Sequence, residues 1–236
     1  RGPAFPSGSR ATAVNDEIQA RAQRVASGVA AGVVYGAVRV FIRLFLWPYF
    51  RLRETGRQNL PTSGPVILAP VHRSNLDSLL LAPVTRRHFR ALAKLSLFKA
   101  RSFAWLLSAL GAFPVRRGSA DRESIRAARS LLDDGALLLV FPEGGRQTGD
   151  HIAGLFDGTA FLAARTGASV VPVGISGTEE AMPMGSRFPR PKRVCVAIGS
   201  PIPPPDRHAP RSALREWTMT LTAGLQEAQD TAVSLG

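Results

Sequence analysis

The sequence predicts an α/β fold with a mainly parallel central sheet and helices on both of its faces. Short runs of Val, Ile, Leu and Ala alternate with helical stretches from about Arg51 onward, an order typical of parallel sheets. Hydrophobic residues make up 45% of the 236 residues and charged residues 20%, which indicates a folded chain with a large core. In the first fifty residues, apolar and aromatic side chains surround two arginines. This third pattern predicts an amphipathic, membrane-associating helical segment before the sheet.

The composition of the N-terminal part of the chain changes near residue 14. Residues 1–14 are rich in Gly, Pro, Ser and Ala, which predicts a flexible tail. A helix is expected to begin near Asn15, because Asp16 and Glu17 suit the positive end of a helix dipole. It is expected to continue, with a break, to Phe50.

Residues 15–55 are expected to form membrane-associating helices. The uncharged stretch Val25–Val38 holds about 14 residues, fewer than the roughly 20 that a transmembrane helix needs. Arg39 and Arg43 follow, four apart and so on one helical face, within a broad apolar surface. We expect this helix to lie in the membrane interface, on the cytoplasmic face. The alternatives are a helix packed on the domain with its arginines directed to solvent, and a transmembrane span.

Residues 56–236 are expected to form one domain built around the sheet. Strands are predicted at Val66–Ala69, Phe89–Ala93, Ala112–Val115, Ala136–Phe141, Ser169–Ile175 and Arg193–Ile198. Helices are predicted at Leu76–Ala82, Leu97–Leu110, Asp121–Leu132, Ala153–Thr166 and Ser212–Ala232.

The net charge of +13 is carried mainly by arginine, since all but three of the 30 basic residues are Arg. Guanidinium groups bind phosphate and carboxylate in a bidentate manner, so the charge indicates an anionic partner: nucleic acid, a membrane surface or a phosphorylated substrate. Cys195 is the single cysteine, which excludes an intramolecular disulfide and a cysteine metal cluster. No metal site is expected, because His88, His151 and His208 show no paired ligand spacing.

His72 and Asp77 follow the first predicted strand, where open α/β sheets collect functional groups. Positions five apart on an ideal helix point about 140° away from each other, so the two side chains can meet only if His72 precedes a helix that contains Asp77. An aspartate bound to one ring nitrogen would leave the other nitrogen as a base. Ser74 and Ser78 are near, but no Gly-x-Ser-x-Gly turn occurs. A substrate hydroxyl is therefore the simpler nucleophile; a chance spacing is the alternative reading.

The stretch Phe141–Arg146, which reads Phe-Pro-Glu-Gly-Gly-Arg, follows another predicted strand. Gly144 and Gly145 let backbone N–H groups approach an anion closely, and Arg146 supplies a bidentate donor. An ordinary glycine turn with exposed charges is the alternative.

Two more predicted strands end in basic residues. Arg116 and Arg117 follow Ala112–Val115, and because neighbouring side chains point to opposite sides of a strand, only one of them is expected to face a site. Lys94 ends a further strand. Single basic residues at strand ends are usually solvated, but together these residues describe a base surrounded by phosphate-binding cations.

The motifs resemble those of the glycerolipid acyltransferase family typified by 1-acylglycerol-3-phosphate O-acyltransferases, or lysophosphatidic acid acyltransferases. The resemblance extends from about Gly56 to Pro203. Its matching stretches, in the family's order, are His72-x4-Asp77, Gly111 to Arg117, Phe141 to Arg146 and Val171-Pro172-Val173.

The resemblance implies that residues 56–236 are an acyltransferase domain. Such a domain moves a fatty acyl group from acyl-CoA or acyl carrier protein to the free hydroxyl of 1-acylglycerol-3-phosphate, making phosphatidic acid in phospholipid synthesis. His72 would be the general base and Asp77 its partner. No cofactor is implied, because the acyl thioester is a substrate. The implied partners are lysophosphatidic acid, the acyl thioester and the membrane surface, and no nucleic acid is expected. The acceptor's phosphate and glycerol would be bound by Lys94, Arg117, Glu143, Gly144, Gly145 and Arg146.

Three positions depart from the family pattern. Gly145 stands where a threonine is common, Arg116 where an acid is common, and Asp157 where a basic residue is frequent. These departures affect the acceptor more than the reaction type, so glycerol 3-phosphate or another lysolipid is an alternative acceptor. Outside the enzymes, the alternative is a basic protein that only binds a membrane surface, but that function leaves the strand-end motifs unexplained.

Overall fold

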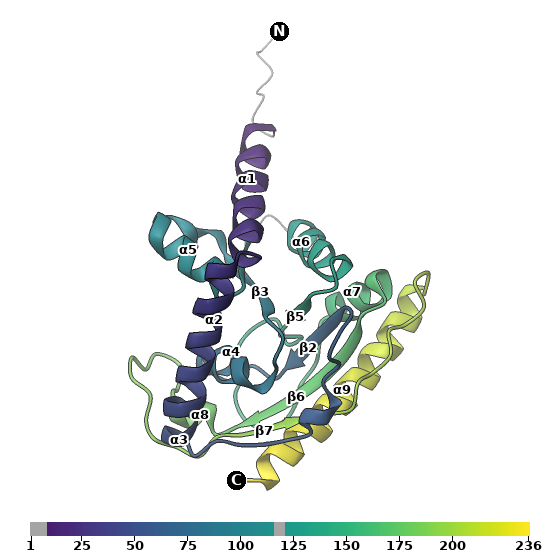
Figure 1. Ribbon diagram of the computed structural model, residues 1–236. Helices are drawn as coiled ribbons and strands as arrows, with labels where there is room; N and C mark the ends of the chain where they lie inside the picture. Colours follow the sequence, from purple (N-terminus) through teal and green to yellow (C-terminus); the bar gives the residue numbers. More distant parts are fainter. Residues whose placement is uncertain (1–8, 116–120) are drawn as a thin grey trace.

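The computed structural model describes residues 9–115 and 121–236, which form a seven-stranded sheet between two layers of helices (Figure 1). The strand order is β1-β7-β6-β2-β5-β3-β4, and every neighbouring pair is parallel except β6 and β7. The predicted α/β class with a mainly parallel sheet is therefore confirmed. The strands are β1 (Arg53–Thr55), β2 (Val66–Pro70), β3 (Phe89–Lys94), β4 (Ala112–Val115), β5 (Leu137–Leu139), β6 (Ser169–Ser176) and β7 (Cys195–Ile198).

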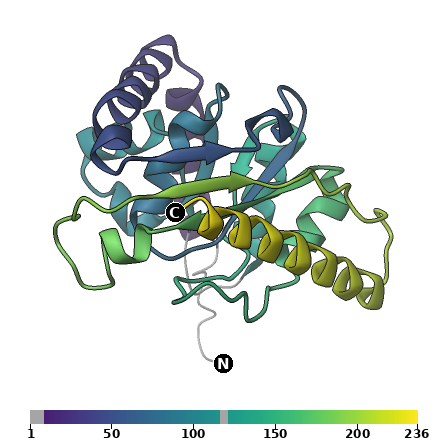
Figure 2. The same ribbon diagram turned by 90° about the horizontal axis from the view of Figure 1, so that it is seen from below.

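Helices cover both faces of the sheet. Figure 1 shows α2, α4 and α5 on one side and α6, α7 and α9 on the other. Figure 2 shows the same separation from below, with α9 in yellow and the N-terminal helices in purple. The helices are α1 (Ser9–Ala26), α2 (Val29–Phe41), α3 (Trp47–Tyr49), α4 (Leu76–Leu81), α5 (Arg101–Ala109), α6 (Asp121–Asp133), α7 (Gly158–Thr166), α8 (Thr178–Ala181) and α9 (Arg211–Ser234), with short 3-10 turns at Arg57–Asn59, Ala82–Val84 and Leu95–Phe98.

Strand β2 is buried along its whole length because it serves two hydrophobic cores. Val66 and Leu68 belong to the core beneath α4 and the helical turns at Ile42–Tyr49. Ile67 and Ala69 belong to the core beneath α6 and α7. This division follows from the alternation of side chains along a strand. A strand buried on both faces reads as a continuous apolar run, which is why its position could be predicted.

The N-terminal segment is helical over more of its length than predicted. Helix α1 begins at Ser9 rather than near Asn15, so only residues 1–8 of the predicted tail lie outside the described residues. The predicted break is present at Ser27 and Gly28. Beyond it, α2, a π-helical turn at Ile42–Leu46 and α3 form one continuous helix.

This continuous helix, Val29–Tyr49, is 21 residues long and has a mean hydropathy of 1.8 over its most apolar window. It is long and apolar enough to cross a membrane, and only 17% of that window is buried within the protein. The charge-free stretch alone therefore understated the length of the helix. Its exposed large side chains are Val29, Val33, Val40, Phe41, Leu44, Phe45 and Tyr49.

The two arginines of this helix are held by the domain. Arg39 donates to the carbonyl oxygens of Thr85 and Arg86, at 3.0 and 2.9 Å. Arg43 lies 3.4 Å from a carboxylate oxygen of Glu54 and stacks its guanidinium 4.0 Å from the Trp47 ring centroid. The basic stripe thus fastens the helix to the sheet domain and leaves the apolar side exposed.

Several element boundaries differ from the prediction, by one or two residues at β5 (Leu137–Leu139) and β7 (Cys195–Ile198) and by more elsewhere. Arg53–Thr55, assigned to the helical segment, forms strand β1, which pairs with β7. Helix α7 begins at Gly158 rather than Ala153. The helix predicted over Leu97–Leu110 is a 3-10 turn followed by α5.

Candidate active site

Strand β2 and helix α4 bring His72 and Asp77 together. β2 ends at Pro70, His72 lies in the connection, and Asp77 is the second residue of α4. Nδ1 of His72 lies 2.9 Å from Oδ2 of Asp77. The predicted arrangement, with the histidine in a turn and the aspartate in the helix after it, is therefore confirmed.

Asp77 holds the histidine in one orientation. Its side chain is fully buried, and Oδ2 also accepts hydrogen bonds from the backbone N–H groups of Arg73 at 2.7 Å and Ser74 at 2.8 Å. Because a carboxylate only accepts hydrogen bonds, Nδ1 of His72 is the donor to Oδ2, and in the neutral imidazole Nε2 then has the lone pair. The side chain of His72 is 20% exposed, so part of the imidazole is open to a substrate.

A buried ion pair between Arg73 and Glu143 supports the turn that holds His72. The carboxylate of Glu143 accepts from Nη1 of Arg73 at 2.8 and 2.9 Å and from the backbone N–H of His72 at 2.8 Å. The two paired side chains are 1% and 2% exposed. Nε of Arg73 donates to the carbonyl of Gly149 at 2.6 Å. Glu143 therefore supports the histidine turn, and the acceptor-binding role that the resemblance implied for it stays a prediction.

The ring of Phe141 fixes the plane of the imidazole. The two rings stack with their centroids 3.8 Å apart and an interplanar angle of 19°. The backbone N–H of Gln147 donates to the carbonyl of His72 at 2.8 Å. The segment after β5 thus holds His72 through a ring, a carboxylate and a backbone hydrogen bond.

The two glycines of the Phe141–Arg146 turn differ in what they can do. The N–H of Gly144 donates to the carbonyl of Phe141 at 3.1 Å, within the turn, and the predicted approach of this N–H to an anion stays a prediction. Gly144 has φ of +70°, and a Cβ there would come within 2.5 Å of the Phe156 ring. These two constraints explain why glycine is needed at this position. For Gly145, which is partly exposed, the predicted role stays a prediction.

The predicted cations follow strands that end at the same edge as β2, because β2, β5, β3 and β4 are mutually parallel. Arg146 is exposed in the turn after β5. Lys94 is the last residue of β3, but its side chain is not among the described ones. Arg117 and its neighbour Arg116 follow β4 and lie outside the described residues. The topology thus brings these chain segments to one edge, and their contact with substrate stays a prediction.

Sequence reasoning missed the role of Arg73. Arg73 was given no role from the sequence, yet this residue is 3% exposed and paired with Glu143, 70 positions away. Phe141 was recognised as part of a motif but was given no role. No local pattern signals a buried pair between segments this far apart.

Comparison with known proteins places these features in a family. The model of the family described as Acyltransferase matches residues 51–176, more than half of the chain. A Chlamydomonas reinhardtii protein named 1-acyl-sn-glycerol-3-phosphate acyltransferase is 33% identical over 163 residues, covering 66% of this chain and 48% of its own length. A Bacillus subtilis protein of the same name is 25% identical over 177 residues, covering 74% of this chain and 86% of its own.

The structural likeness agrees with the sequence likeness. The crystal structure of the 1-acyl-sn-glycerophosphate (LPA) acyltransferase PlsC from Thermotoga maritima superposes with a TM-score of 0.69 at 25% identity, covering 84% of this chain and 80% of that one. The chain spans about half the length, or less, of the algal and plant relatives that it matches. Since the family model covers both β2 with its histidine turn and the turn after β5, the chain belongs to the Acyltransferase family.

Proposed function

We propose that this protein transfers a fatty acyl group from a thioester to the free hydroxyl of 1-acylglycerol-3-phosphate, forming phosphatidic acid. The observation that carries this proposal is the hydrogen bond of 2.9 Å between His72 and Asp77, with the histidine side chain partly exposed. Proteins named for this activity share up to about a third of their residues with the matched part of the chain.

The geometry supports general-base catalysis without a protein nucleophile. Nε2 of His72 takes the proton of the acceptor hydroxyl while that oxygen attacks the thioester carbonyl. When the tetrahedral intermediate collapses, the C–S bond breaks, the new C–O ester bond remains, and the proton passes from His72 to the departing thiolate. Asp77 stabilises the imidazolium that forms between these two proton transfers.

The acceptor's phosphate would be bound by cations at the carboxyl edge of the sheet. Arg146 is exposed in the turn next to His72, and Lys94 is the last residue of β3, which ends at the same edge. Arg117, which follows β4 in the sequence, lies outside the described residues. Guanidinium groups hold phosphate with two parallel hydrogen bonds. A phosphate fixed there would bring the glycerol hydroxyl toward the histidine.

The exposed side of the helix Val29–Tyr49 supports work at a membrane surface, where a lysolipid acceptor resides. Phe41 and Phe45 are 53% and 61% exposed, and their ring centroids lie 5.0 Å apart. Helix α5, which packs against α1 and α2, adds exposed Phe103 and Trp105. Exposed aromatic and aliphatic side chains of this kind enter the boundary between lipid headgroups and acyl chains.

The decisive experiment measures release of free thiol. The purified protein is mixed with acyl-CoA or acyl carrier protein thioester, and then with lysophosphatidate, glycerol 3-phosphate or an uncharged-headgroup lysolipid. We expect thiol release that depends on lysophosphatidate and yields phosphatidic acid. Release with glycerol 3-phosphate alone would reassign the acceptor, and no acceptor-dependent release with either donor would refute the acyltransferase activity.

A further inference from the structure

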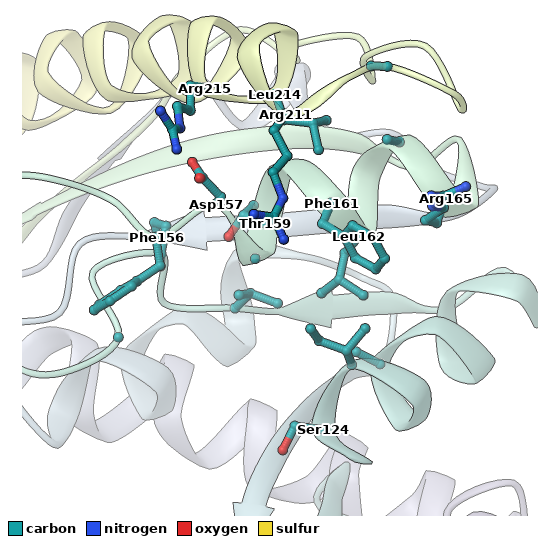
Figure 3. A pocket seen from close by; sticks show the side chains of 18 of the residues that line it. Ser124, Phe156, Asp157, Thr159, Phe161, Leu162, Arg165, Arg211, Leu214 and Arg215 are labelled. Atoms are coloured by element: carbon teal, nitrogen blue, oxygen red, sulfur yellow. The ribbon is translucent and has the colours of Figure 1, made fainter. Parts of the chain in front are cut away.

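A second concave site lies on the face of the sheet away from α2. It is a cavity of about 970 Å³ bounded by α6, α7, α9 and the segment before α9 (Figure 3). Cavities of several hundred cubic ångströms are typical of sites for small molecules and cofactors.

Four arginines line this cavity: Arg165 of α7, Arg207 in the segment before α9, and Arg211 and Arg215 of α9. In Figure 3, Arg211 and Arg215 reach from α9 toward α7. Among the lining residues that the structure describes, Asp157 is the one acid, and its Oδ1 accepts a hydrogen bond from Thr218 at 3.1 Å. The cavity therefore carries an excess of positive charge sufficient for more than one phosphate group.

The rest of the lining is apolar and aromatic. Ile125, Leu162 and Leu214 contribute aliphatic surface, and the guanidinium of Arg165 lies 5.3 Å from the centroid of the Phe161 ring. Phe156 is 68% exposed, an unusual degree for a phenylalanine. An aromatic surface next to arginines suits a ligand with a planar ring as well as phosphates.

The cavity adjoins the histidine turn. Phe141 lines it and also stacks on His72, so one ring belongs to both sites. Phe156, whose N–H donates to the carbonyl of Pro142 at 3.0 Å, packs its ring over Gly144 of the same turn. A ligand held by the arginines could therefore send a flexible arm past Phe156 to the reacting centre.

We propose that this cavity binds the 3′-phosphoadenosine diphosphate part of coenzyme A, and so receives the acyl donor from the side opposite the exposed face of α2. The inference rests on the proposed function and gives it a donor. Three phosphates match the arginines, adenine matches the apolar and aromatic surface, and pantetheine is the arm that carries the thioester to His72.

The first test measures binding without catalysis. The probe is adenosine 3′,5′-bisphosphate, titrated by calorimetry into wild type, into the double variant Arg211→Ala/Arg215→Ala, and into the control Arg126→Ala/Arg187→Ala. The control removes the same charge from exposed arginines that do not line the cavity. We expect wild type and control to bind alike and the Arg211/Arg215 variant at least about tenfold more weakly, because hydrogen bonds to charged groups are lost. No binding to wild type, or equal loss in the control, overturns the site.

The second test uses the same acyl group on coenzyme A, on 3′-dephospho-coenzyme A and on pantetheine. In wild type we expect KM to rise with each truncation. In the Arg211/Arg215 variant, we expect KM to rise for acyl-coenzyme A and to stay unchanged for acyl-pantetheine, which has no phosphate, and for lysophosphatidate. Equal KM for all three donors, or variants that impair only a carrier-protein donor, would contradict the inference. Bisphosphate binding without any thiol release would keep the site and refute the proposed function.

Discussion

The carboxylate of Glu143 lies 2.8 Å from the backbone nitrogen of His72, and the same group pairs with the buried guanidinium of Arg73. The turn that holds the histidine is thus fastened to the turn after β5 by one buried acid. The histidine motif and the Phe141–Arg146 motif are separate in the sequence, but in the fold Glu143 joins them by hydrogen bonds and an ion pair.

Glu143→Gln is expected to destabilise the protein and to lower kcat with little change in acceptor KM. Removing one partner of a buried ion pair leaves the other charge uncompensated, which costs about 3–5 kcal/mol. The free energy of unfolding from denaturant titration and the kinetic constants with lysophosphatidate check this. The control is Glu180→Gln, whose side chain is 72% exposed. A rise in acceptor KM at unchanged stability would return Glu143 to the acceptor site.

His72→Ala is expected to lower turnover by roughly 10²–10⁴-fold, the usual contribution of a positioned general base. Asp77→Asn should cause a loss in the same direction, because an amide in place of the carboxylate can favour the wrong imidazole tautomer. Thiol release under saturating substrate measures both. Ser78→Ala is the control, and a loss as large as that of His72→Ala would instead indicate a protein nucleophile.

The sequence predicted the features that depend on local pattern. The continuous apolar run of β2 reads as a strand buried on both faces. The spacing of His72 and Asp77 allows contact only across the start of a helix, so their geometry could be stated in advance. Both inferences use residues that are close along the chain.

What could not be predicted depends on distant pairing. Strand β1 has only three residues, two of them charged, and is defined by its register with β7, where Arg53 pairs with Cys195. Glu143 between a proline and a glycine looks like a surface residue until Arg73 is placed against it. Arg39 belongs to the basic stripe of the predicted interfacial helix, but its guanidinium donates to the carbonyl of Thr85 in the domain.

Arg146→Ala is expected to raise KM for lysophosphatidate about tenfold or more and to leave kcat within a few-fold. The reason is the loss of charge-assisted hydrogen bonds to the acceptor phosphate. Steady-state kinetics at varied lysophosphatidate checks this, with Arg86→Ala as an exposed control of the same charge. If KM for lysophosphatidate stays at the wild-type value in Arg146→Ala, this arginine does not bind the phosphate.

His88 is expected to make stability fall in mild acid. Its ring stacks on Tyr35 with centroids 3.9 Å apart, and burial, with the charge of Arg90, lowers the pKa of His88 from 6.5 to about 4. Below pH 6.5 the unfolded chain therefore binds a proton that the folded protein does not, so stability present above about pH 6.5 is lost as the pH falls toward 4. In His88→Gln this contribution is absent. Thermal melts at pH 7.5 and 5.0 should show a smaller fall in Tm for the variant; equal falls would contradict the assignment.

Phe41→Ser/Phe45→Ser is expected to weaken binding to lipid vesicles by roughly 10- to 100-fold. The exposed parts of the two rings together amount to about one side chain, whose full burial contributes about 1.5–3 kcal/mol. Both rings are more than half exposed, so the fold should be unaffected. Co-sedimentation with phosphatidylcholine vesicles containing phosphatidylglycerol measures the affinity.

Met219→Ser is the matched control, since Met219 is 65% exposed on α9, on the other face of the sheet. If Met219→Ser weakens binding as much as the double variant does, or if the double variant binds like wild type, the membrane contact does not lie on the helix Val29–Tyr49. If only the double variant is impaired, the lipid surface contacts the face that the arginines leave exposed, because Arg39 and Arg43 are already engaged by the domain.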